Sequence, residues 1–118
     1  MIAGVGTDII EIGRIREFAA RGERYLRRVF TPRELATASE RRMSAAFLAG
    51  RFAAKEAVAK CLGPPLKWSE VEILASEDGK PEAALNGRAA EIAGGGRILV
   101  TISHSQDYAV AVAILERD

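Results

Sequence analysis

Glu56 and Lys60 are the first residues whose types and spacing suggest chemistry. They lie four positions apart in the stretch FAAKEAVAK, so on a helix their side chains leave the same face one turn apart. A glutamate and a lysine at this spacing form a helix-stabilising ion pair in many proteins. They would serve phosphate chemistry instead if a second carboxylate joined them, because two hard oxygen ligands, completed by waters and phosphate oxygens, bind Mg²⁺.

Asp8 is the candidate for that second carboxylate. It stands near the end of the apolar run MIAGVGTDII, which contains two glycines. Two hypotheses stay open for this residue. It is either a metal ligand at the end of a strand or a helix cap, since Asp8 and Glu11 have the spacing of a capping box.

His104, the only histidine, lies between two serines, and this trio offers several hydrogen-bond donors to a phosphate group. Ser103, His104 and Asp107 make a poor hydrolase triad, because serine and histidine are adjacent and no nucleophile-elbow pattern surrounds them. No P-loop pattern and no paired cysteines or histidines for zinc are present. Arg51 and Lys55 are either phosphate ligands or ordinary charges on a helix surface.

A strand and a long helix must position these residues. Residues 1–10 are predicted to form a strand whose glycines let its backbone approach another element closely. A helix follows from residue 11, and Thr31-Pro32-Arg33-Glu34 predicts the start of another with a capping box. The longest helix is predicted over residues 44–62, where Gly63 and two prolines end it.

The second half of the chain favours strands. Strands are predicted over residues 71–75, 82–85, 98–102 and 108–115, with a short helix over residues 88–93. The last two strands are joined by a tight connection, which predicts an antiparallel hairpin. Because helices come mostly early and strands mostly late, the predicted fold class is α+β.

The composition predicts one domain over residues 1–118. A content of 48% hydrophobic and 28% charged residues is that of an ordinary globular protein, and a core of this size would gain burial from association with other copies. The single Cys61 excludes an internal disulfide. The first ten residues resemble neither a signal peptide nor a membrane span, so the expected location is the cytoplasm.

The charge balance limits the expected partners. The 17 basic and 16 acidic residues nearly cancel, so neither nucleic acid nor an anionic membrane is expected to bind. Between Arg14 and Arg42, however, nine arginines accompany only four glutamates and form a basic patch. Few aromatic residues lie in that patch for stacking on bases, which disfavours an RNA-binding role.

Three segments read together resemble the holo-acyl-carrier-protein synthase family of 4'-phosphopantetheinyl transferases. They are GTDIIEIGRI at residues 6–15, RFAAKEAVAK at residues 51–60 and SHSQDYA at residues 103–109, in the family's order. The resemblance implies a curved antiparallel sheet packed against a long helix. It also implies a homotrimer in which coenzyme A lies in a cleft between neighbouring subunits.

By this resemblance, Asp8 and Glu56 would bind Mg²⁺ at the pyrophosphate of coenzyme A, and Lys60 would contact the same phosphate oxygens. A serine of an acyl carrier protein would attack the β-phosphoryl group and release 3',5'-ADP, in support of fatty acid or polyketide synthesis. The proton acceptor stays open between Glu56 and a water held by the metal.

The remaining binding residues also come from the resemblance. Coenzyme A would be contacted by Arg51, Lys80, Pro81, His104 and Ser105, besides Lys60. The acidic recognition helix of the carrier protein would dock on Arg14, Arg21 and Arg24. The chain departs from the family at Gly63-Pro64-Pro65, where the prolines remove two backbone donors from a region expected near coenzyme A.

Two other functions are weighed against this one. A related transferase with a different carrier preference stays open. A non-catalytic module that uses the arginines to bind an acidic protein is disfavoured, because it would not need Asp8, Glu56 and Lys60 together.

Overall fold

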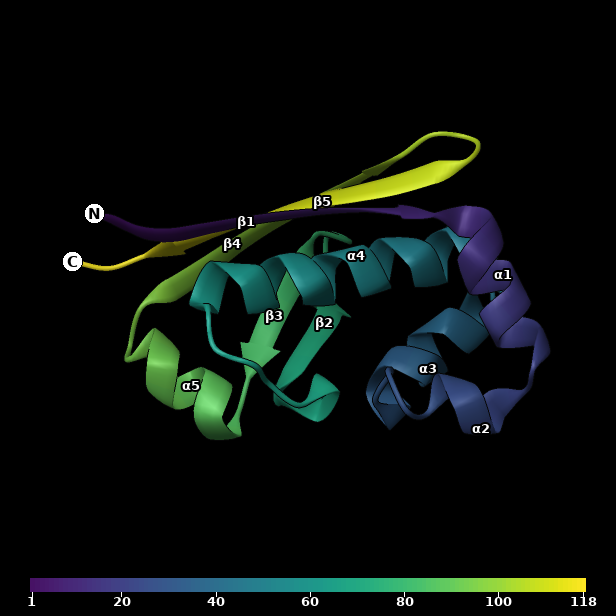
Figure 1. The fold of residues 1–118 in the computed structure, drawn as a ribbon, viewed down its shortest axis with the longest axis horizontal. Helices are drawn as coiled ribbons and strands as arrows, with labels where there is room; N and C mark the ends of the chain where they lie inside the picture. The colour runs from purple at the N-terminus through teal and green to yellow at the C-terminus, as the bar shows by residue number, and fades with distance from the viewer.

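The long helix α4 (Ala45–Leu62) lies between two antiparallel sheets in a computed structural model that describes residues 1–118 (Figure 1). The first sheet has the strand order β1 (Ile2–Glu11), β5 (Tyr108–Glu116) and β4 (Arg97–His104). The second is a hairpin of β2 (Val71–Ala75) and β3 (Pro81–Leu85). The α+β class and the closing hairpin are thus confirmed, and β4 extends two residues beyond the predicted strand end at residue 102, so that His104 is its last residue.

The shorter helices gather at the two ends of α4 (Figure 1). One end carries α1 (Ile12–Ala20), α2 (Glu23–Leu26) and α3 (Pro32–Glu40), whereas α5 (Gly87–Ala93) lies toward the other end and the 3-10 helix η1 (Trp68–Glu70) precedes β2. The predicted capping box of α3 is present: Thr31 Oγ1 accepts from the Glu34 amide, and Glu34 Oε1 accepts from the Thr31 amide at 2.8 Å. Ser44 caps α4, and Gly63 ends it with a φ of 105°.

Small residues let β1 lie directly on α4. A Cβ atom added at Gly6 would stand 2.0 Å from the Ala57 carbonyl oxygen, and one at Gly4 would stand 2.4 Å from that of Cys61. The predicted close backbone approach is therefore made, and any side chain at either position would push the strand away from the helix. This contact sets how near the inward side chains of β1 come to those of α4.

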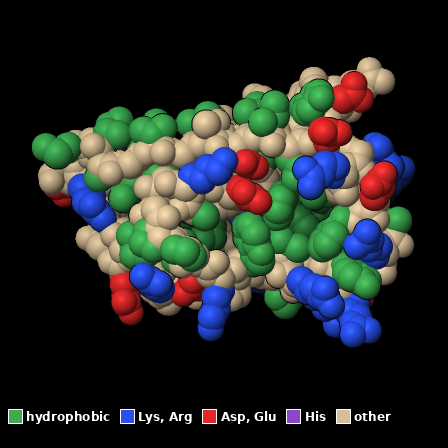
Figure 2. Space-filling view, in the orientation of Figure 1, with side chains coloured by type: hydrophobic (Ala, Val, Ile, Leu, Met, Phe, Trp, Pro, Cys, Tyr) green, Lys and Arg blue, Asp and Glu red, His purple; other side chains and the backbone are tan.

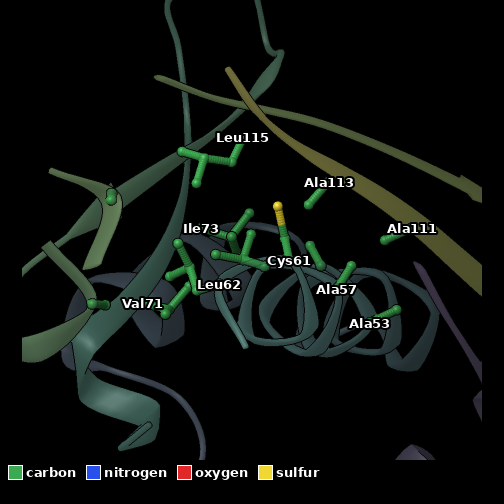
Figure 3. Close-up of a cluster of buried hydrophobic side chains, with 13 residues drawn as sticks. Ala53, Ala57, Cys61, Leu62, Val71, Ile73, Ala111, Ala113 and Leu115 are labelled. Atoms are coloured by element: carbon green, nitrogen blue, oxygen red, sulfur yellow. The ribbon is translucent and has the colours of Figure 1, made fainter. Parts of the chain in front are cut away.

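The core behind this contact is built from short side chains (Figure 3). Ala53 and Ala57 of α4 lie under Ala111 and Ala113 of β5, and all four are fully or almost fully buried. A second cluster joins α1, α3 and the first half of α4 around Ile12, Ile15, Phe30, Leu35 and Leu48. The two clusters fix α4 against the sheet on one side and against α3 on the other.

The outer face of the first sheet is apolar and exposed. Val5, Ile9 and Leu99 have 62%, 64% and 45% of their surface exposed, although strand alternation places them beside further branched side chains of β5. Hydrophobic side chains line the edge of the molecule where β1 and β5 run (Figure 2). None of the helices combines the length and the apolar character that a membrane span requires.

Candidate active site

Asp8 and Lys60 meet where the end of β1 crosses the second half of α4. Lys60 Nζ lies 3.0 Å from Asp8 Oδ1 and 3.1 Å from the Thr7 carbonyl oxygen. Alternation along β1 turns Gly4, Gly6 and Asp8 toward the helix, so the close packing at Gly6 brings this carboxylate to α4. The Asp8 side chain is only 14% exposed, whereas that of Lys60 is 55% exposed.

Glu56 lies one turn before Lys60, half-buried and without an ion-pair partner. Burial raises the pKa of the Glu56 carboxyl, the nearby Asp8 carboxylate raises it further, and Lys60 lowers it. The helix ion pair considered for Glu56 and Lys60 is therefore wrong, because Lys60 turns to Asp8. The capping hypothesis for Asp8 is wrong as well: Glu11 occupies the N-cap of α1, and no side chain caps it.

Asp8 and Glu56 line the same pocket, and Glu56 has no ion-pair partner, so together they form a suitable donor set for a hard divalent ion. No cluster of three or more potential metal-ligating side chains exists here. Mg²⁺ does not need one, since it is commonly held by one or two carboxylates together with waters and substrate phosphates. Both side chains offer the carboxylate oxygens that such an ion prefers. The nearby Asp8 carboxylate also raises the pKa of Glu56, and a bound cation would relieve this repulsion.

An apolar pocket of about 500 Å³ opens beside the two carboxylates. Asp8 and Glu56 form part of its lining, Arg14 edges it, and most of the remaining wall is hydrophobic, including Ile15, Phe18, Phe30, Phe52 and Trp68. Acidic side chains beside a green hollow are visible near the middle of the face in Figure 2. The sequence reasoning missed this pocket, because its walls come from four separate segments with no common motif.

A smaller pocket of about 210 Å³ lies on the β3 and β4 side of α4 and contains three of the predicted nucleotide-binding residues. Arg51, Pro81 and His104 line it together with Arg41. The Arg51 guanidinium stacks 4.4 Å from the Phe47 ring centroid, and burial and then Arg41 lower its pKa. Two arginines without a lining carboxylate favour an anionic ligand.

Lys80 and Ser105 do not line this pocket. Lys80 is exposed in the turn between β2 and β3, near Asp78. Ser105 Oγ accepts a hydrogen bond from the Tyr108 amide at 3.3 Å and closes the β4–β5 turn. Ser103 and His104 occupy alternate faces of β4, which agrees with the rejection of a hydrolase triad.

The three predicted docking arginines are all exposed but lie in different surroundings. Arg14 edges the apolar pocket. Arg21 stands 5.9 Å from the Tyr25 ring centroid, and Arg24 lies in α2. All three belong to the segment that spans α1 and α2.

Lys55 is the residue that the sequence reasoning placed least well. It is not a surface charge: its side chain is 0% exposed and forms an ion pair with Glu34. A signal for this was present, because Lys55 shares a helical stripe with Leu48, Val58 and Leu62. The chain departs from the family pattern at Gly63-Pro64-Pro65, and this segment runs on to Trp68. Neither proline lines either of the two pockets.

Comparison with known proteins identifies the family of this chain. The family model for the 4'-phosphopantetheinyl transferase superfamily matches residues 4–113. The chain therefore belongs to the 4'-phosphopantetheinyl transferase superfamily, as its sequence motifs predicted.

Individual relatives agree over almost their whole length. The chain is 44% identical over 123 aligned positions to the holo-[acyl-carrier-protein] synthase of Geobacillus kaustophilus, covering 99% of this chain and 91% of that protein. The crystal structure of the Neisseria meningitidis holo-[acyl-carrier-protein] synthase matches with a TM-score of 0.87 and 32% identity, covering 99% and 100% of the two chains. The Bacillus anthracis enzyme in complex with CoA (3',5'-ADP) matches with a TM-score of 0.83 and 31% identity, covering 100% and 99%.

Proposed function

We propose that this protein transfers the 4'-phosphopantetheine group of coenzyme A to a serine of an apo acyl carrier protein and releases 3',5'-ADP. Fatty acid or polyketide synthesis would use the product. The observation that carries the proposal is the meeting of Asp8, Glu56 and Lys60 where β1 crosses α4, in a chain whose relatives are holo-[acyl-carrier-protein] synthases. Residues 1–118 would act as one transferase domain.

The reaction needs groups that neutralise phosphate charge and accept one proton. The serine oxygen forms a bond to the β-phosphorus of coenzyme A, and the bond from that phosphorus to the bridging oxygen breaks, leaving the electron pair on 3',5'-ADP. Lys60 is a cation with more than half its side chain exposed, so it can stabilise the leaving oxygens. Glu56 has no ion-pair partner and is the residue of this chain best placed to accept the serine proton.

Asp8 and Glu56 would hold a magnesium ion. When bound, Mg²⁺ would neutralise the pyrophosphate of coenzyme A and polarise the phosphoryl group under attack. Lys60 would then exchange its contact with Asp8 for one with phosphate. The pair with Asp8 keeps this lysine on the site before substrate binds.

The nucleotide end of coenzyme A would occupy the smaller pocket. Arg51 and His104, with Pro81 on the wall, would contact a phosphate and a planar base there; all three line this pocket. Ser105 and Lys80 would contribute from the rims, since both are exposed and each is adjacent along the chain to a residue of that lining.

The carrier protein would approach over the apolar pocket. Arg14 stands at that pocket beside Asp8 and Glu56, so an acidic helix docked on Arg14, Arg21 and Arg24 would present its serine to the two carboxylates. A cytoplasmic location goes with this proposal, since a single buried thiol does not require an oxidising compartment.

A homotrimer is also part of the proposal. The exposed side chains of Val5, Ile9 and Leu99 continue across β5 through Val110, Val112 and Ile114, which share the same face in register. An apolar sheet face of this kind is typical of a subunit interface. Active sites between neighbouring subunits would follow if the sheet of one copy covered the nucleotide pocket of another.

The test is intact-mass spectrometry of an apo acyl carrier protein incubated with this protein, coenzyme A and Mg²⁺, with a parallel sample that contains a chelator. A gain equal to one phosphopantetheine arm, appearing only with metal, would support the transfer reaction. No gain with several carriers from a folded protein would favour the alternative of a non-catalytic module that binds an acidic protein through its arginines.

A further inference from the structure

Lys55 is a fully buried cation that the proposed chemistry does not use. It lies one position before Glu56 in α4, and its Nζ donates to Glu34 Oε1 at 2.8 Å and to the Val71 carbonyl oxygen at 2.7 Å. The Glu34 carboxylate accepts two further bonds, from the Thr31 amide and from the Ile73 amide, both at 2.8 Å. One ammonium and one carboxylate therefore connect α4, the start of α3 and strand β2.

The two segments that bond to Lys55 and Glu34 each come shortly after a residue that lines the apolar pocket. Phe30 immediately precedes Thr31, and Trp68 lies in the short helix that immediately precedes Val71. Both rings pack on Phe52 of α4, with centroid distances of 6.4 Å for Phe30 and 5.3 Å for Trp68. Phe52 lies one turn before Glu56, so the three rings form a wall beside the carboxylates.

Stability alone does not explain a charged pair at this position. Burial lowers the pKa of the Lys55 ammonium, and the Glu34 carboxylate opposes that shift. Apolar side chains of similar volume commonly replace such buried pairs with no loss of stability. What an apolar pair cannot supply is a set of directional hydrogen bonds that fixes two segments at once relative to one helix.

We infer that Lys55 is a positioning residue that holds Phe30 and Trp68 against Phe52 and thereby shapes the pocket into which the carrier protein presents its serine. This role rests on the proposed function for the identity of the partner. It acts on the carrier side of the site only, because Arg51, Pro81 and His104 line a separate pocket.

The experiment uses the double variant Lys55→Met, Glu34→Gln, since Lys55→Met alone would leave a buried carboxylate without its cation. We expect kcat/KM for the carrier to fall about 10- to 100-fold through a raised KM, with the KM for coenzyme A changed less than about twofold. Trp68 is the only tryptophan, so its emission should shift to longer wavelength and become more accessible to acrylamide. Unchanged carrier KM and Trp68 emission, or equal rises in both KM values, would overturn the inference.

Two further variants keep the result interpretable. Leu115→Ala removes a buried side chain at the far end of the sheet, so it should lower the melting temperature without changing carrier KM or Trp68 emission. Glu34→Gln alone leaves the Lys55 ammonium buried without its carboxylate, so it should lower the melting temperature more than the double variant and shift both readouts in the same direction; no shift contradicts the inference. A wild-type protein that transfers nothing would refute the proposed function alone, because Trp68 emission still decides whether Lys55 holds the walls.

Discussion

Lys60 Nζ lies 3.0 Å from Asp8 Oδ1, so this lysine pairs with a carboxylate of β1 and leaves Glu56, its neighbour on the same helix face, without a cation. The two carboxylates therefore differ in their partners. Asp8 is paired with a cation of the protein, whereas Glu56 has no ion-pair partner and is available to a metal ion or a proton.

Lys60→Met should lower kcat for phosphopantetheine transfer about 100- to 1,000-fold, because a cation aimed at developing phosphate charge is removed. The fold should survive, since the side chain is more than half exposed. Steady-state kinetics on an apo carrier would measure the loss. Lys67→Met, at another exposed lysine outside the carboxylate site, is the matched control and should keep nearly full activity.

Glu56→Gln should abolish transfer while leaving the metal-free protein at least as stable as the wild type. The raised pKa of Glu56 shows that burial and Asp8 disfavour its charged form, so a neutral amide removes an unfavourable charge. Thermal melts with and without Mg²⁺ would check both parts. Magnesium should raise the melting temperature of the wild type only, and an equal rise in the variant would place the ion elsewhere.

Arg14→Glu should weaken carrier binding at least about tenfold, because it puts a negative charge beside the apolar pocket and repels an acidic helix. Coenzyme A binding should change little, as Arg14 is absent from the pocket around Arg51. Titration of each ligand separately would distinguish the two effects. Arg97→Glu, at a distant exposed arginine paired with Glu116, should leave both affinities unchanged.

Glu72 should make the stability of the protein depend on acid pH. Its pKa is lowered chiefly by the hydrogen bond from Arg33 and also by Thr31, against the effect of burial. A carboxyl whose folded pKa lies below its unfolded value of about 4.3 stabilises the fold above that value, and the contribution is lost as pH falls through the folded pKa. Glu72→Gln should therefore lower the melting temperature by a few degrees at neutral pH and by less near pH 3. A difference that grows toward acid pH would contradict this sign.

Ile9→Glu should dissociate the proposed homotrimer, because it places a charge on the apolar sheet face. Light scattering coupled to size-exclusion chromatography would give the mass of each form. Thr37→Glu on the surface of α3 is a control outside that face. A wild type that runs as a monomer would remove the trimer from the proposal.

The local signals of the sequence were sufficient for most elements and for the family. Gly63 and the prolines after it end α4, and the Thr31 capping box starts α3, because helix ends depend on backbone groups within a few residues. The residues alone paired Asp8 with Glu56 only as one of two hypotheses, and the resemblance chose between them, since their spacing along the chain carries no information about contact. Only the tertiary structure decided that Lys60 pairs with Asp8 and that Lys55 is buried in an ion pair with Glu34. It also decided that Lys80 lies apart from Arg51 and His104.

These outcomes depend on strand register and on how closely Gly6 lets β1 approach Ala57. Such distances between separate elements are set by packing rather than by neighbours along the chain.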